Sequence, residues 1–183
     1  QREATPGVAF PEQDAGDQAF ADSFPFQETP DQADAIDQVH GDLGRARGMD
    51  RLICGDVGFG KTEVAVRAAF GVAVNGRQVL VLCPTTILAE QHWNTFRERY
   101  RDFPVRVEMV SRFRRPGEVK AVLKEFADGK IEVLVGTHRI LSRDVIPKQL
   151  GLVIVDEEQR FGVAQKELLR PLRLGVGVLA LSA

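Results

Sequence analysis

Apolar residues occur in short unbroken runs along the chain, and these runs alternate with longer segments in which apolar residues recur at helical spacing. The runs occupy residues 51–54, 78–83, 105–110, 131–135, 151–155 and 176–181. Helical spacing is found at residues 29–43, 62–75, 86–100, 116–128 and 163–170. An unbroken apolar run is typical of a strand buried on both faces, and strands that alternate with helices form βαβ units. The pattern therefore predicts an α/β fold with a mostly parallel β-sheet flanked by helices, whose strands all end at one edge.

The first 28 residues lack this order. They mix Gly, Pro, Asp and Gln with isolated aromatic residues and show no sustained period. We interpret residues 1–28 as a linker or an N-terminal arm that wraps the domain, and residues 29–183 as the domain itself. The chain starts at Gln1 rather than Met and stops at Ala183 directly after a strand-like run, so we expect it to be part of a longer protein.

Composition narrows the class of protein without indicating a function. Of the 183 residues, 44% are apolar and 27% are charged, which is ordinary for soluble globular proteins. No apolar stretch approaches the roughly 20 residues of a membrane span, and no secretory leader is recognisable. Cys54 and Cys83 lie in apolar runs, where cysteine behaves as a small hydrophobic residue, and their spacing suits neither a zinc site nor a disulfide framework. We therefore expect a cytoplasmic protein without a membrane partner.

The net charge of −2 hides an uneven distribution of acids and bases. Residues 1–34 hold eight acids against a single base, whereas residues 35–183 hold 23 bases and 18 acids. A mildly basic body behind an acidic entry segment fits a nucleic-acid surface but does not require one.

A glycine-rich stretch between an apolar run and a helical segment predicts a phosphate-binding loop. It matches the pattern G-x-x-x-x-G-K-[ST] and consists of Gly55, Asp56, Val57, Gly58, Phe59, Gly60, Lys61 and Thr62. Glycines let backbone N–H groups approach phosphate oxygens, and the helix that follows adds its free N–H groups and the positive end of its dipole. Lys61 would reach the β- and γ-phosphates, and the hydroxyl of Thr62 would ligate Mg²⁺. The strand–loop–helix context favours nucleotide binding over a turn that binds nothing.

A group of acidic residues follows a second apolar run. Residues 152–155 are Leu-Val-Ile-Val, and Asp156-Glu157-Glu158-Gln159 come next. Acids at the carboxyl end of a buried strand lie where open α/β sheets bind their ligands. Asp156 would hold the Mg²⁺ shell and Glu157 would polarise the water that attacks the γ-phosphate. Strands also end in solvated acids without any function, but together with the phosphate-binding loop the motif indicates a P-loop NTPase.

Other strand exits carry groups suited to nucleic-acid phosphates. Thr85 and Thr86 follow the second run, and Gly136, Thr137 and His138 follow the fourth. Helix capping by Thr85 and Thr137 is the simpler explanation on physical grounds alone. Arg112 belongs to a basic cluster at 111–115 that contains one aromatic residue, which is consistent with DNA-backbone contacts or with a solvated turn.

Thr29-Pro30-Asp31-Gln32 is a helix start, with Thr as N-cap, Pro at the first position and Gln32 at the third. The amide of Gln32 could in addition read the adenine edge, since it offers one donor and one acceptor. Trp93 and Tyr100 are seven residues apart on one expected helix, so core packing is the favoured interpretation. The three histidines, His40, His92 and His138, are scattered and form no predicted ligand set.

These motifs, in this order, resemble the first motor lobe of superfamily-2 helicases and translocases, and within that group the bacterial transcription-repair coupling factors. The resemblance covers about residues 24–183 and is carried by residues 24–26, 29–32, 49–52, 55–65, 111–114 and 156–163. The RecG-like branch-migration helicases share Gly-Asp-Val-Gly at 55–58 and Arg-Phe-Gly-Val at 160–163. Phe59 and the Ser-Arg-Phe-Arg run at 111–114 favour the coupling factors.

The resemblance implies a RecA-like P-loop NTPase lobe that binds ATP, Mg²⁺ and one face of double-stranded DNA. Lys61, Asp156 and Glu157 would be catalytic, Gln32 and residues 55–62 would bind nucleotide, and Thr62 and Asp156 would hold the metal. DNA would be bound by Thr85, Thr86, Arg112, Gly136, Thr137 and His138. The whole protein would translocate on DNA, displace stalled RNA polymerase and recruit excision-repair proteins through regions outside this chain.

The resemblance also has gaps. The family usually has His where this chain has Gln159, so the coupling of hydrolysis to motion at that residue is an open question. A second RecA-like lobe, with its arginine finger, would have to come from outside the chain, so we expect residues 1–183 alone to hydrolyse ATP negligibly. Three alternatives stay open: a RecG-like lobe, a P-loop kinase or GTPase, and a DNA-binding module without ATPase activity. A carboxylate beside the metal ligand suits water activation, which argues against the kinase.

Overall fold

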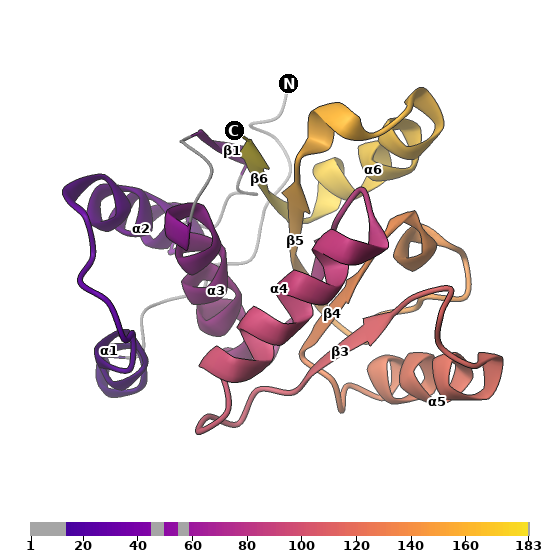
Figure 1. Cartoon of the computed structure of the whole chain (residues 1–183), viewed down its shortest axis with the longest axis horizontal. Coiled ribbons are helices and arrows are strands. Elements are labelled where there is room, and N and C mark those ends of the chain that lie inside the picture. Colours follow the sequence, from indigo (N-terminus) through magenta and orange to yellow (C-terminus); the bar gives the residue numbers. More distant parts are fainter. Residues whose placement is uncertain (1–13, 45–49, 55–58, 183) are drawn as a thin grey trace.

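The centre of the structure is a sheet in which every pair of neighbouring strands is parallel (Figure 1). The computed structural model describes residues 14–44, 50–54 and 59–182. Its strands are β1 (Asp50–Cys54), β2 (Gln78–Leu82), β3 (Val107–Val110), β4 (Val133–Gly136), β5 (Leu150–Asp156) and β6 (Gly177–Ser182). They lie in the order β1-β6-β5-β2-β4-β3. The predicted parallel sheet and each of its predicted strands are confirmed, with bounds that differ by one or two residues.

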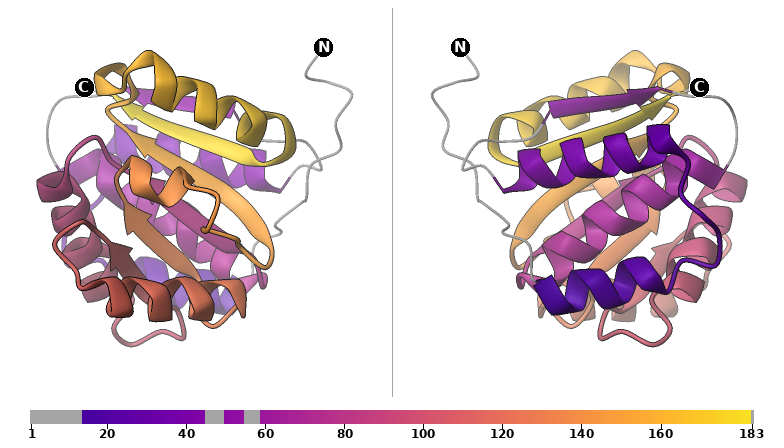
Figure 2. Two further views of the ribbon diagram at one scale, coloured as in Figure 1. Left: turned by 90° about the vertical axis from the view of Figure 1, so that its right-hand side faces the viewer. Right: turned by 90° about the vertical axis from the view of Figure 1, so that its left-hand side faces the viewer.

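Helices cover both faces of the sheet (Figure 2). Helices α1 (Asp14–Asp22), α2 (Pro30–Leu43), α3 (Phe59–Val74) and α4 (Thr86–Arg99) contribute to one core layer. Helices α5 (Pro116–Ala127) and α6 (Val163–Gly175), together with a short 3₁₀ helix at His138–Leu141, contribute to the other. Within the described residues, no helix is long and apolar enough to cross a membrane.

The central strands are apolar over most of their length because each has a core layer on either side. In β5, Leu152 and Ile154 belong to the layer under α3, whereas Val153 and Val155 belong to the opposite layer. Successive side chains of a strand point to opposite faces, so a strand covered on both sides needs apolar residues at every position. This explains why the sequence showed unbroken runs rather than alternation.

A helix lies within the segment that we interpreted as a linker or arm. Helix α1 carries Phe20, which is 1% exposed and stacks on Phe70 of α3 with ring centroids 4.1 Å apart. Phe103 contacts the ring of Phe20 edge-on, with the two ring centroids 5.0 Å apart. The helix was absent from our sequence prediction because one buried aromatic in a polar segment leaves no periodic signal. The boundary at residue 29 stays a prediction.

Helix α6 is longer than predicted, because it continues through Pro171 to Gly175. The sequence analysis places helical spacing at residues 163–170, and proline, which lacks an N–H, disfavours a helix interior. Leu169 is buried and Leu172 packs against the same core layer. Packing of these two leucines therefore holds the helix together beyond the proline.

Candidate nucleotide site and adjoining groove

Three strands end side by side at the edge where the sequence predicts a phosphate-binding loop. Cys54, the last residue of β1, pairs with Ser182 of β6, and Leu181 of β6 pairs with Asp156 of β5. Strand β1, which precedes the predicted loop, and strand β5, which leads into the acidic motif, therefore end at the same edge of the sheet, as predicted. Gly55, Asp56, Val57 and Gly58 lie outside the described residues, and so does the side chain of Phe59, so their phosphate contacts stay predictions.

Lys61 lies in the first turn of α3 and reaches across this edge. Its Nζ donates a hydrogen bond to the backbone carbonyl of Ser182 at 2.7 Å. Thr62 follows it in the same turn and is half-buried. The predicted phosphate-binding lysine is thus held at the carboxyl ends of the strands, where the phosphates of a nucleotide would lie.

Gln32 joins the start of α2 to the start of α3. Its Oε1 accepts from the backbone N–H of Thr29 at 2.8 Å, while Oγ1 of Thr29 accepts from the N–H of Gln32 at 3.2 Å. The predicted capping box is therefore present. A Cβ on Gly60 would lie only 3.2 Å from Nε2 of Gln32, so the amide packs directly against the helix that carries Lys61. Its contact with adenine stays a prediction.

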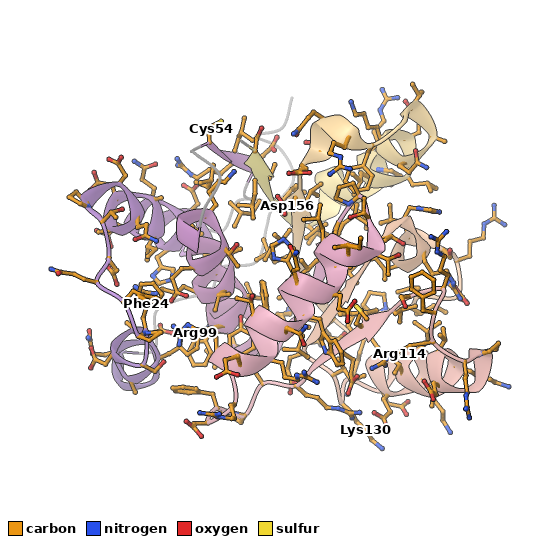
Figure 3. The ribbon with its side chains drawn as sticks, viewed as in Figure 1. Phe24, Cys54, Arg99, Arg114, Lys130 and Asp156 are labelled. Atoms are coloured by element: carbon orange, nitrogen blue, oxygen red, sulfur yellow. The ribbon has the colours of Figure 1, made fainter. Side chains whose placement is uncertain are left out.

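Asp156 ends β5 beside α4 (Figure 3). Oδ2 of Asp156 lies 2.6 Å from Nε2 of His92, and the two side chains are 14% and 11% exposed. The sequence prediction left His92 without a role, because the contact depends on β5 lying next to β2, the strand that precedes α4. Within the described residues, no cluster of three or more His, Cys, Asp or Glu side chains could hold a metal by itself.

Glu157 has an unusual backbone. Its φ and ψ are 48° and 51°, which makes it the non-glycine residue with positive φ in the described part of the chain. Its N–H donates to the carbonyl of Leu181 at 2.9 Å, and its Oε2 accepts from Nη1 of Arg160 at 2.8 Å. Such conformations are disfavoured for most residues and persist where the surroundings enforce them, often at functional sites.

Gln159 is exposed in the short 3₁₀ helix Glu158–Arg160. Its role in coupling hydrolysis to motion stays a prediction.

The two cysteines differ in burial. Cys83 is buried, and burial, followed by the negative charges of Asp156 and Glu157, raises its pKa well above the usual value. Cys54 is exposed, so the expectation that it behaves as a buried hydrophobic residue is wrong. The cause is its place at the very end of an outer strand.

A groove of about 1260 Å³ adjoins this site at the ends of β2, β3 and β4. Five of the six residues predicted to bind DNA line it: Thr85, Thr86, Arg112, Thr137 and His138. Its remaining charged lining consists of four bases and one acid: Arg114, Lys120, Lys124, Arg139 and Asp144. The structure thus brings three sequence-distant strand exits together around one basic groove.

The small residues at the groove have different tasks. Oγ1 of Thr85 accepts from the N–H of Leu88 at 3.2 Å, so this threonine caps α4. Thr137 precedes the 3₁₀ helix but makes no side-chain capping bond. Gly136, the sixth residue predicted to bind DNA, is buried in β4 and does not line the groove. A Cβ at this position would lie 2.5 Å from Cγ2 of Ile140. Its small size serves close packing beneath the groove.

Charges and apolar groups both contribute to the groove surface. Arg139 donates two hydrogen bonds of 2.7 Å to the carboxylate of Asp144, and this holds the pKa of Asp144 below its usual range. The guanidinium of Arg112 lies 5.0 Å from the ring centre of Phe113. Exposed apolar side chains at the groove are Ile87, Phe113 and Ile146. The surface can therefore contact both phosphates and apolar sugar or base edges.

A buried ion network beside the first turn of α3 was missed by the sequence prediction. Oε1 of Glu63 accepts from Nε of Arg67 at 3.0 Å and from Nη2 of Arg99 at 2.6 Å. Oε2 accepts from Nε of Arg99 at 3.0 Å. Arg67 also pairs with Glu28, and Arg99 donates to Oγ of Ser23 at 2.7 Å. Figure 3 shows Arg99 close to Phe24, and its guanidinium lies 5.5 Å from that ring centre. The network ties the N-terminal segment to α3 and α4.

Trp93 of α4 and Tyr100, the residue that follows the helix, differ in burial. Tyr100, just after the helix, is buried and donates to the carbonyl of Val66, and burial raises its pKa well above the usual value. Core packing is thus confirmed for Tyr100. Trp93 is only half-buried, and its Nε1 donates a hydrogen bond to the carbonyl of Val107 at 3.2 Å. The guanidinium of Arg97 lies over its ring, 4.2 Å from the ring centre.

Comparison with known proteins agrees with this geometry. The family model described as DEAD/DEAH box helicase matches residues 29–183. Proteins named transcription-repair-coupling factor are 55% identical to the chain in Escherichia coli (strain K12), 51% in Borreliella burgdorferi and 49% in Bacillus subtilis (strain 168). Each match covers 100% of this chain and 16% of the relative, so the chain spans about a sixth of their length.

A solved structure extends the comparison to the fold. The chain resembles the protein in "Structure of RecG bound to three-way DNA junction" with a TM-score of 0.86 and 33% identity, over 100% of this chain and 24% of that one. The expected RecA-like fold and the resemblance to transcription-repair coupling factors are both confirmed.

Proposed function

Because the chain belongs to the DEAD/DEAH box helicase family, we propose that it is the ATP-binding motor lobe of a double-stranded DNA translocase. The whole protein would displace stalled RNA polymerase and couple transcription to nucleotide excision repair, as the name of the 49–55% identical relatives suggests. One observation carries the proposal: Lys61 and Asp156 lie at the same sheet edge as a basic groove of about 1260 Å³. Nucleotide and DNA would therefore occupy neighbouring halves of that edge.

Bound Mg²⁺ would neutralise phosphate charge and orient the phosphate oxygens. The residues present fit this ion, since the hydroxyl of Thr62 and the carboxylate of Asp156 are oxygen donors of the kind that Mg²⁺ prefers. Mg²⁺ is usually bound through one or two carboxylates plus substrate phosphates, so a single carboxylate beside bound ATP would suffice. Lys61 would exchange the carbonyl of Ser182 for a phosphate oxygen of ATP.

Glu157 is the proposed general base for hydrolysis. Its carboxylate would accept the proton of the attacking water, and its backbone bond to Leu181 holds the residue at the end of β6. The bond from Arg160 orients the carboxylate but leaves it accessible, since the Glu157 side chain is 29% exposed. Charge on the leaving phosphates would be offset by an arginine from a second lobe, as in other NTPases.

The groove is the proposed site for DNA. Arg112, Lys120 and Lys124 would contact backbone phosphates, and Thr86 in the first turn of α4 would offer its hydroxyl and a free backbone N–H. A RecG-like branch-migration helicase is the second candidate, supported by the structural similarity at 33% identity. The higher identity to coupling factors favours the first. RNA polymerase and repair proteins would bind regions outside this chain.

The nucleotide site is tested by Lys61→Ala. We expect this variant to lose measurable binding of ATP–Mg²⁺ in calorimetry and to keep its fold, because a half-buried lysine outside the core contributes little to stability. Lys130→Ala is a matched control, since Lys130 is an exposed lysine remote from the carboxyl edge. Equal ATP affinity in Lys61→Ala and the wild-type chain would contradict the proposed site.

A further inference from the structure

His92 is the side chain through which α4 contacts the proposed magnesium ligand. Its Nε2 lies 2.6 Å from Oδ2 of Asp156. An ionised carboxylate only accepts hydrogen bonds, so Nε2 is the donor in this pair. The bond engages Oδ2 and restricts rotation of the group, and the carboxylate keeps further lone pairs with which it could bind a metal ion.

The orientation of His92 is set by its helix. Its ring meets Phe96 edge-on, with centroids 6.3 Å apart and the planes at 83°. Phe96 and Ala89 are buried beneath α4, and the cap formed by Thr85 fixes the start of the helix. The imidazole is therefore held in place before any ligand arrives, which is what a group that orients another side chain requires.

We propose that His92 is a positioning residue for the nucleotide site, which holds the Asp156 carboxylate in the orientation that binds Mg²⁺. This proposal rests on the proposed function of Asp156 as a metal ligand. Hydrogen-bond partners of metal-ligating carboxylates typically change metal affinity or activity about 10–100-fold when they are removed. A histidine buried only for packing would change the stability of the chain and leave its metal affinity unaltered.

The hydrogen bond from His92 to Asp156 lies in a region of concentrated negative charge. Asp156 and Glu157 are adjacent carboxylates, and their charge reaches far enough to act on the buried thiol of Cys83. Without a donor, the half-buried Asp156 carboxylate could turn to solvent or away from its neighbour. The bond from His92 opposes that rotation and offsets part of the cost of burial.

The test is a titration of the 183-residue chain with Mg²⁺ in the presence of a fluorescent ATP analogue. His92→Phe keeps the ring packing on Phe96 and removes the donor, whereas His92→Gln retains an amide nitrogen near the position of Nε2. We expect His92→Phe to raise the Mg²⁺ concentration at half-saturation by about 10–100-fold. His92→Gln should restore most of this loss, and affinity for the analogue in EDTA should be the same in all three proteins.

His92→Asn provides a second variant if phenylalanine is poorly tolerated. Its side chain is too short to reach Asp156, so it should need as much additional Mg²⁺ as His92→Phe, and thermal unfolding would verify that each variant is folded. A wild-type chain that binds no nucleotide with Mg²⁺ would refute the proposed function itself. If the wild type binds and the Phe and Asn variants need no more Mg²⁺, or if Gln is as impaired as Phe, the positioning role is wrong.

Discussion

Replacement of Glu63 by alanine should be among the most destabilising single changes in this chain. The Glu63 side chain is 4% exposed and accepts three hydrogen bonds, of 2.6, 3.0 and 3.0 Å, from Arg67 and Arg99. These arginine side chains are themselves only 6% and 9% exposed, and Nη2 of Arg67 already lacks a hydrogen-bond partner among the described residues. Glu63→Ala would remove the carboxylate that both guanidinium groups share, so that Arg99 would lose its ion-pair partner and Arg67 would keep only its pair with Glu28. Removal of one partner from a buried pair typically costs about 3–5 kcal/mol.

Urea denaturation measures this cost. With a slope of about 2 kcal/mol/M, a loss of this size moves the unfolding midpoint down by roughly 1.5–2.5 M. Glu98→Ala, in α4 next to Arg99, is the control, since the side chains of Glu98 and its partner Arg101 are 74% and 71% exposed and 3.8 Å apart. An exposed pair of this kind contributes at most about 1 kcal/mol. If Glu63→Ala shifts the midpoint no further than Glu98→Ala, with equal slopes, the buried network is not a stabilising element.

Four other outcomes are expected. In a protein that carries both motor lobes, Glu157→Gln should bind ATP normally and lose hydrolysis, because an amide cannot accept the proton of water; turnover near the wild-type rate would place the base elsewhere. Asp144→Asn should tighten the binding of duplex DNA, since Arg139 would lose its ion pair and could contact a phosphate. The slope of the logarithm of the DNA association constant against the logarithm of salt concentration should become steeper by about one. An unchanged slope would argue against DNA in the groove. Burial raises the pKa of Cys83, so this thiol stays protonated as the pH rises past the pKa of an unfolded cysteine. Iodoacetamide should therefore modify the exposed Cys54 in the native chain and Cys83 only after unfolding. Equal modification rates for the two cysteines in the native chain would contradict the burial of Cys83. The chain by itself should release negligible phosphate from ATP with or without duplex DNA, and robust DNA-stimulated release would show that the chain supplies its own arginine finger.

Several features of this protein could be predicted from short stretches of sequence because their causes are local. A strand covered on both faces has to be apolar at every position, and this identified the strands and the parallel sheet. The capping box formed by Thr29 and Gln32 depends on groups three residues apart. Acids that follow an apolar run indicate the ligand-binding edge, and Asp156 lies there.

Other features depended on which strands and helices became neighbours, and only the tertiary structure decided this. His92 and Asp156 are 64 residues apart and meet because β5 lies beside β2. Phe20 gave no periodic signal, yet it is buried because Phe70 and Phe103 converge on the same place. Such contacts result from the packing of whole elements, which depends on the sum of many burial terms rather than on any short segment. The sequence alone therefore predicted the edge at which the proposed nucleotide site lies, whereas the contact between His92 and Asp156 emerged only from the order of the strands.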